Sequence, residues 1–386
     1  MQVVKMLLGI LCVFVVLLDA FQTIILPRRA AGRLRLTRIF YILTWIPWRF
    51  VAVRIRHPRK RETALSFYGP LSLIFLLVVW ACGMVFGFSL IYYALGNPFS
   101  DASHPLGYLS GLYVSGTSFF TLGLGDVIPR GEAARALITI EGGTGFGFLA
   151  VVMGYFPVLY GAFSRREVSI SLLDARAGSP PTAAELMRRH SFDGAEDALS
   201  TLLSEWERWS AELLESHISY TLLCYFRSQH TNQSWLSALT AMLDTSALLI
   251  AGVRGHEARQ AQLTFAMARH AIVDLAQVFS ISPSQKIPDR LPQERYEQLY
   301  QLLCQSGVSV CRDGESYDRL RNLRALYEGY AAALSEHLCM PLPPWIAEQP
   351  HKDNWLAVAK VRSQAEAANP DPSTIGEVID RHHHEF

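Results

Sequence analysis

Apolar residues are concentrated in the first 165 positions of the chain, in three long runs separated by basic or polar segments. The runs cover residues 6–26, 70–95 and 132–163. A helix needs about 20 predominantly apolar residues to cross the hydrocarbon core of a bilayer. Each run therefore predicts one membrane-spanning helix, the first of them within residues 1–27. The more polar residues 166–340 predict a water-soluble helical domain, followed by a tail over residues 341–386.

The segment between the first two runs, residues 28–65, is strongly basic. Only Glu62 opposes a set of eleven cations, which are Arg28, Arg29, Arg33, Arg35, Arg38, Arg49, Arg54, Arg56, Arg59, Lys60 and Arg61. Dense positive charge beside a membrane helix stays in the cytoplasm. We therefore predict that the first run is an uncleaved helix with its N-terminus outside, because removal of a signal peptide would place this charge outside.

The same basic segment is interspersed with tryptophan and tyrosine, which prefer the headgroup level of a membrane. We expect one or two helices on the cytoplasmic surface, broken near Pro47, with the cations from Arg28 to Arg61 bound to anionic lipids. Arg35 and Arg38 have the spacing of a voltage sensor, but Tyr41 and Thr44 do not continue it. Voltage sensing is therefore disfavoured.

Asp19 is an ionisable residue inside the first apolar run. Such residues are costly in a membrane and are candidates for function. Here we favour a structural role, in which the carboxylate pairs with the neighbouring arginines.

A short aromatic-rich segment, residues 108–120, lies between the second and third runs and is too short to span. Its length suits a re-entrant helix surrounded by protein. It is followed by a hexapeptide with glycine at alternate positions: Thr121, Leu122, Gly123, Leu124, Gly125 and Asp126. Glycine reaches positive φ without a steric penalty, so a row of carbonyls can face one way and replace the hydration shell of a cation.

This hexapeptide, TLGLGD, resembles the selectivity filter of potassium channels, which commonly reads TVGYGD, TIGFGD or TIGLGD. The resemblance covers residues 66–165 and implies an outer helix, a pore helix, a filter and an inner helix. It also implies a homotetramer around one pore, with K+ ions in the filter and no other cofactor. A dinucleotide-binding loop is disfavoured, because it requires a preceding strand and a third glycine. Phe120 and Leu124 depart from the family, which usually has threonine and an aromatic residue there.

The third run is rich in glycine, and Gly145 falls at the position of the hinge glycine of the family's inner helix. Pro157 lies near a proline bend that some members carry, so the resemblance implies a gating helix. Close helix packing is the competing role for these glycines. Glu141 either lines the pore or lies behind the filter and accepts hydrogen bonds from Thr117 or Ser118. The second placement is favoured.

The soluble domain is predicted to be entirely helical. Thr182 and Glu185 form a capping box. Residues 235–253 could be mistaken for a fourth span, but Asp244 and the lack of flanking basic clusters favour a buried core helix. His270 and Asp274 lie one turn apart, a spacing more typical of a salt bridge than of a metal site. The histidines 382–384 carry at most weak metal affinity.

The sequence thus predicts an all-α, multi-pass protein of the plasma or inner membrane, with a cytosolic C-terminal domain and a pore for potassium ions. No catalytic motif is present, so no enzymatic activity is expected, and a net charge of +1 gives no reason to expect nucleic acid. An unidentified cytosolic ligand is a candidate partner. Two alternatives stay open: a poorly selective cation channel, and a membrane-tethered signalling protein whose helical domain is the active part.

Overall fold

The computed structural model describes residues 1–26, 35–101, 107–191, 195–230, 232–252, 257–284, 288–308 and 315–347. The predictions for Arg28, Arg29 and Arg33 and for the tail from residue 348, including the histidines 382–384, fall outside these residues. The chain divides into two compact units, Met1–Ala162 and Phe163–Phe386.

The first unit contains the apolar helices expected from the sequence. They are α1 (Gln2–Ile24), α2 (Leu36–Val53), α3 (Pro58–Ala94), the short α4 (Tyr108–Phe119) and the first part of α5 (Glu132–Ala177). All but α4 are long and apolar enough to cross a membrane. Two short strands were not predicted: β1 (Phe99–Asp101) pairs antiparallel with β2 (Val127–Pro129). In the described part of the unit, the regular secondary structure is therefore helical apart from this two-stranded sheet.

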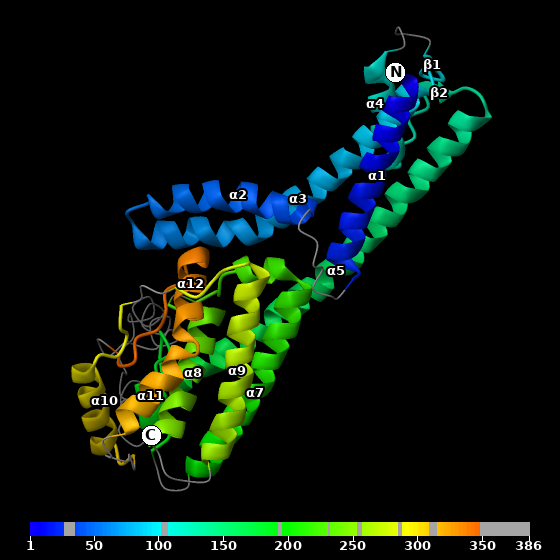
Figure 1. The fold of residues 1–386 in the computed structure, drawn as a ribbon. Coiled ribbons are helices and arrows are strands. Elements are labelled where there is room, and N and C mark those ends of the chain that lie inside the picture. The colour runs from blue at the N-terminus through cyan, green and yellow to red at the C-terminus, as the bar shows by residue number, and fades with distance from the viewer. Residues whose placement is uncertain are drawn as a thin grey trace, which may run out of the picture. The chain divides into compact units, whose positions relative to one another are not determined.

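Helices α1 and α3 lie against each other in opposite directions (Figure 1). Small residues allow this close approach: a Cβ on Gly9 would lie 2.7 Å from the carbonyl oxygen of Gly87, and one on Gly83 would lie 2.8 Å from Val16. Near the start of α1, the Lys5 ammonium lies 3.8 Å from the ring centroid of Tyr93. The N-terminal end of α1 therefore lies beside the C-terminal end of α3.

Asp19 joins three helices through hydrogen bonds to uncharged groups among the residues that the structure describes. Its carboxylate, 4% exposed, accepts hydrogen bonds from the backbone N–H of Thr37 at 3.1 Å, the Thr37 hydroxyl at 2.6 Å and the indole N–H of Trp80 at 2.9 Å. Thr37 is in the first turn of α2, where backbone N–H groups lack helical partners. Arg28, Arg29 and Arg33 lie outside the described residues, so the expected pairing with the neighbouring arginines stays a prediction.

We predict that Asp19→Ala lowers the free energy of unfolding by about 2–4 kcal/mol, because buried donors on Thr37 and Trp80 then lose their acceptor. Asp19→Asn should cost less, since its amide oxygen still accepts. Denaturation of the purified protein in detergent measures both, and an Ala variant as stable as the wild type would show that these bonds contribute nothing.

Helix α2 runs antiparallel to the first half of α3, and the two form a hairpin (Figure 1). The rings of Trp45 and Tyr68 pack at 4.7 Å, and the Trp48 indole donates to the Ala64 carbonyl at 3.0 Å. The predicted break at Pro47 is wrong, because Pro47 lies inside α2. An interior proline removes one backbone hydrogen bond and crowds the carbonyl four residues before it, but here packing against α3 keeps the helix continuous.

Helices α3 and α5 also extend further than predicted. Helix α3 begins at Pro58 and continues through Pro70, and α5 continues past residue 163 to Ala177. Proline suits the first turn of a helix because its missing N–H would have no partner there. The apolar runs predicted only the parts of these helices that suit lipid. The extensions are polar, so hydrophobicity did not indicate that they are helical.

The second unit is built from the end of α5 and seven further α-helices with one short 3₁₀ helix, in the residues that the structure describes. They are α6 (Ala183–Arg189), α7 (Ala195–Ser219), η1 (Thr221–Tyr225), α8 (Trp235–Gly252), α9 (Glu257–Val278), α10 (Gln293–Gln305), α11 (Ser316–Ala325) and α12 (Glu328–Leu338). The side chain of Thr182 accepts from the backbone N–H of Glu185 at 3.2 Å, which confirms Thr182 as the N-cap. The reciprocal bond of the predicted capping box is absent, because the Thr182 N–H donates to the Ala177 carbonyl and the Glu185 carboxylate binds Arg188 and Arg189.

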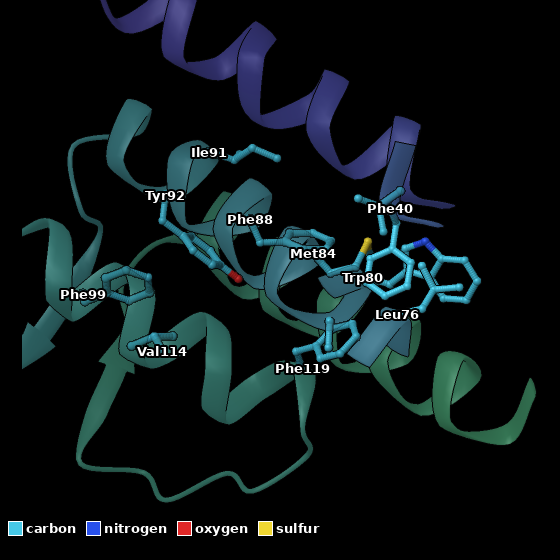
Figure 2. Close-up of a cluster of buried hydrophobic side chains, with 12 residues drawn as sticks. Phe40, Leu76, Trp80, Met84, Phe88, Ile91, Tyr92, Phe99, Val114 and Phe119 are labelled. Atoms are coloured by element: carbon cyan, nitrogen blue, oxygen red, sulfur yellow. The ribbon is translucent and has the colours of Figure 1, made fainter. Parts of the chain in front are cut away.

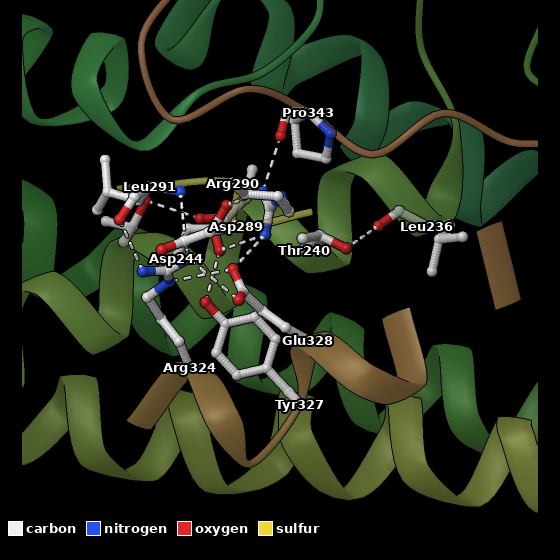
Figure 3. Close-up of polar contacts among 12 residues, drawn as sticks. Leu236, Thr240, Asp244, Asp289, Arg290, Leu291, Arg324, Tyr327, Glu328 and Pro343 are labelled. Atoms are coloured by element: carbon white, nitrogen blue, oxygen red, sulfur yellow. Dashed lines mark hydrogen bonds and ion pairs between the residues drawn. The ribbon is translucent and has the colours of Figure 1, made fainter. Parts of the chain in front are cut away.

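Helix α8 is long and apolar enough to span a membrane, but 94% of its residues are buried within this unit. It also carries the fully buried Asp244, whose carboxylate accepts from Arg290 and from the Tyr327 hydroxyl, both at 2.5 Å (Figure 3). Burial, with Asp244 beside it, raises the pKa of Tyr327 well above its usual range, so this phenol stays a donor. The structure thus supports a core helix rather than a fourth span.

Residues beyond the membrane part of α5 are anchored in the second unit. Arg166, 4% exposed, donates to the carbonyls of Leu223 and Phe226 at 2.9 and 3.0 Å and to Nε2 of His217 at 3.1 Å. Since a guanidinium only donates, this Nε2 carries no proton. Burial and the nearby Arg166 hold the pKa of His217 well below its usual range, so the imidazole is neutral.

Candidate ion pore

The backbone of the hexapeptide alternates between positive and negative φ. Thr121, Gly123 and Gly125 have φ of 57°, 56° and 76°, and the residues between them are not in the left-handed region. Such alternation turns successive carbonyls toward one side of the chain, as a row of cation ligands requires. Thr121 adopts this conformation although it bears a Cβ, so the backbone around it must stabilise a left-handed residue.

The last turn of the pore helix α4 holds the start of the hexapeptide. The Ser118 carbonyl accepts from the N–H of Thr121 at 3.0 Å, and the Thr117 carbonyl accepts from the N–H groups of Leu122 at 2.7 Å and Gly123 at 3.4 Å. Thr117 and Ser118 thus contact the hexapeptide through their carbonyls. The Thr117 hydroxyl donates instead to the Val114 carbonyl within α4.

The other face of α4 packs on α3. Tyr92, Phe88, Met84 and Trp80 follow one another along α3 in a buried cluster that includes Val114 and Phe119 of α4 (Figure 2). Burial of this apolar surface fixes the pore helix within the unit.

Glu141 lies behind the pore helix and not on an exposed face, in keeping with the favoured placement. Its partners differ from those expected: the Tyr92 hydroxyl donates to Oε2 at 2.6 Å, and the Ser115 hydroxyl is hydrogen-bonded to Oε1. The bonds expected from Thr117 or Ser118 are not the ones observed, because the donor from α4 is Ser115 and the Thr117 hydroxyl binds the Val114 carbonyl. The carboxyl joins α3, α4 and α5.

Gly145 lies directly against the end of the pore helix. A Cβ at this position would lie 1.9 Å from the carbonyl oxygen of Phe119 and 2.7 Å from its carbonyl carbon. By contrast, a Cβ on Gly143, Gly147 or Gly154 would have no neighbour within 4 Å. Gly145 is therefore a site of close backbone approach, which favours the packing role; its role as a hinge remains a prediction.

Pro157 lies inside α5, as the sequence indicated, and is exposed in the single chain. Its role in gating also remains a prediction.

At the outer end of the hexapeptide, the Tyr113 hydroxyl donates to Oδ2 of Asp126 at 2.7 Å. This bond ties the last residue of the hexapeptide back to α4. Four residues after Asp126, the backbone N–H of Arg130 donates to the Pro98 carbonyl at 2.7 Å, and the Arg130 guanidinium donates to the Ser100 hydroxyl at 2.8 Å. Both ends of the hexapeptide are therefore fastened to neighbouring elements.

Sequence reasoning missed Tyr92, Tyr113 and Ser115. Tyr92 and Glu141 are separated by 49 residues, and nothing in the local pattern pairs them. The one available signal was that a carboxyl buried in a membrane helix needs hydroxyl or N–H donors.

His270 and Asp274 contact each other, as their spacing predicted, with Nε2 of the histidine 3.4 Å from Oδ2 of the aspartate. Within the residues that the structure describes, no group of three or more His, Cys, Asp or Glu residues could hold a metal ion.

Comparison with known proteins agrees with this geometry. A family model described as "Ion channel" matches residues 75–159, from the middle of α3 through the hexapeptide and most of the apolar part of α5. This segment is an ion-channel module of the pore-loop type, which confirms the resemblance drawn from the hexapeptide.

The chain is also similar to the uncharacterized membrane protein YdjJ of Bacillus subtilis (strain 168), with 25% identity over 232 residues. The alignment covers 58% of this chain and 66% of that protein. No solved structure matches the chain. The protein is thus a mostly helical membrane protein with an ion-channel module.

Proposed function

We propose that the chain is one subunit of a homotetrameric potassium channel, with the hexapeptide from Thr121 to Asp126 as its selectivity filter. The observation that carries this proposal is the alternating φ of Thr121, Gly123 and Gly125 at the end of a re-entrant helix. Four such backbones around one axis supply rings of oxygen ligands in place of water. Conduction is passive, and no catalytic step takes part.

Exposed side chains in the single chain support the tetramer. Leu122 and Leu124 of the hexapeptide are 63% and 62% exposed, and Phe146 and Met153 of α5 are 67% and 60% exposed. Apolar side chains next to an aqueous pore need protein neighbours, because water does not stabilise them. Three further copies cover this face.

The proposal is tested by potassium uptake into liposomes that contain the purified protein. Uptake should be fast and should exceed sodium uptake by at least tenfold. Equal uptake of both ions would favour the poorly selective channel. That alternative is considered because Leu124 stands where the family usually has an aromatic residue. Absence of flux would favour a tethered protein whose second unit is the active part.

We also propose that the loop between α3 and α4 faces the outside and that the second unit and the basic residues from Arg35 to Arg61 face the cytoplasm, with anionic lipids bound to the latter. The motive is the basic charge that follows α1 and, at Arg165 and Arg166, the apolar part of α5.

Labelling with a membrane-impermeant thiol reagent tests this orientation. Cys304 is exposed in α10, and Glu132 is exposed at the start of α5. A variant that keeps Cys304 as its sole cysteine should react only after the cells are permeabilised, and a cysteine-free chain with Glu132→Cys should react in intact cells. The reverse pattern contradicts the proposed orientation.

A further inference from the structure

The carboxyl group of Glu141 is fully buried, and no charged group pairs with it in the part of the chain that the structure describes. Its side chain is 0% exposed, and its hydrogen-bond partners are the hydroxyls of Tyr92 and Ser115. An ionised carboxylate without a cation is costly in such surroundings, and groups of this kind usually become neutral instead.

The hydrogen bonds around Ser115 bear on where the proton lies. The Ser115 hydroxyl is bonded to Oε1 of Glu141 and also donates to the Val85 carbonyl at 2.9 Å. A serine hydroxyl has one proton, and both a backbone carbonyl and an ionised carboxylate can only accept. With an ionised Glu141, the single Ser115 proton would have to serve both acceptors.

We propose that Glu141 is a neutral carboxylic acid whose Oε1–H donates to Ser115. Ser115 then donates its own proton to the Val85 carbonyl, and the Tyr92 hydroxyl donates to Oε2. Each of the three contacts holds one proton, so the chain of bonds is complete without any buried charge. This protonation state does not depend on the proposed function.

If the hexapeptide is the filter, as proposed above, the chain of bonds also helps to position the pore helix. It joins Val85 and Tyr92 of α3, Ser115 of α4 and Glu141 of α5, and so fixes the pore helix against both long helices. Ser115 lies two residues before Thr117, whose carbonyl holds the start of the hexapeptide. Glu141 is therefore a positioning residue for the pore helix.

Infrared difference spectra of the full-length protein in liposomes, wild type minus Glu141→Gln at neutral pH, test the protonation state. Glutamine has nearly the shape of a protonated glutamate and can donate to Ser115 while accepting from Tyr92. We expect the difference spectrum to contain the C=O stretch of a protonated carboxylic acid, shifted in D2O. A difference confined to carboxylate bands overturns the proposal.

Glu132→Gln is the matched control, since Glu132 is on the same helix but exposed. It should remove carboxylate bands and leave the acid band in place.

A second variant keeps the proposal testable if Glu141→Gln fails to fold. Ser115→Ala removes the acceptor of the acid's proton, so the acid band should persist but shift in frequency. An unshifted band would show that the proton does not lie between Glu141 and Ser115 and would overturn the chain of bonds. Neither measurement requires ion flux, so failure of the proposed function would leave this result standing.

Discussion

Gly123→Ala abolishes potassium flux in our account, and it does so without a steric clash inside the subunit. Gly123 has φ of 56°, and a Cβ there would meet nothing within 4 Å. The cost is conformational, about 1–2 kcal/mol for each left-handed residue, and it arises in all four subunits. Rotation of one peptide to relieve it takes a carbonyl out of the row of ligands. Flux into liposomes should fall at least a hundredfold.

Gly131→Ala is the matched control for this prediction. Gly131 has φ of 82° and equally open surroundings, but it follows the hexapeptide at the turn into α5. It bears the same kind of strain outside the filter, so flux should stay within about twofold of the wild type. If Gly123→Ala conducts as well as Gly131→Ala, the hexapeptide is not the filter.

Gly145→Ala has the second large effect, because the added methyl group would overlap the end of the pore helix. Its Cβ would lie 1.9 Å from the carbonyl oxygen of Phe119. A backbone oxygen cannot swing away as a side chain can, so α4 and α5 must move apart. Overpacking of this kind costs typically about 1–3 kcal/mol per site. We expect fewer assembled tetramers and a marked loss of flux, measured by gel filtration and liposome uptake.

Gly147→Ala separates this packing effect from helix bending. A Cβ on Gly147 would meet nothing within 4 Å, while the gain in helix propensity, about 1 kcal/mol, is the same. Normal assembly of Gly147→Ala beside poor assembly of Gly145→Ala supports packing. Normal assembly of both, with only Gly145→Ala opening less often, would return Gly145 to the role of a hinge.

The sequence was sufficient for features that depend on local pattern. Apolar runs located α1, α3 and α5, and the aromatic-rich segment before Thr121 located α4 within one residue. Alternate glycines also indicated where the backbone becomes left-handed. In each case the cause, lipid exposure or the absence of a Cβ, is a property of the residues themselves.

Features that depend on contacts between distant residues were not predictable in the same way. Asp19 accepts hydrogen bonds from Thr37 and Trp80, the latter 61 residues away, and nothing in the local pattern indicated either partner. Glu141 was expected behind the filter with Thr117 or Ser118 as donor, yet its partners are Tyr92 and Ser115, which depend on the rotation of three helices about their axes. Periodicity gives the apolar face of a helix only to within about one residue, which is too coarse to choose a hydrogen-bond partner.

The reversal potential of the purified channel in a planar bilayer, with potassium on one side and sodium on the other, tests the central claim most directly. We predict a large reversal potential, close to the value for a membrane permeable to potassium alone, because the row of oxygen ligands that begins at Thr121 replaces the hydration shell of that ion. A reversal potential near zero would mean that the pore does not distinguish the two ions and would contradict a potassium-selective filter.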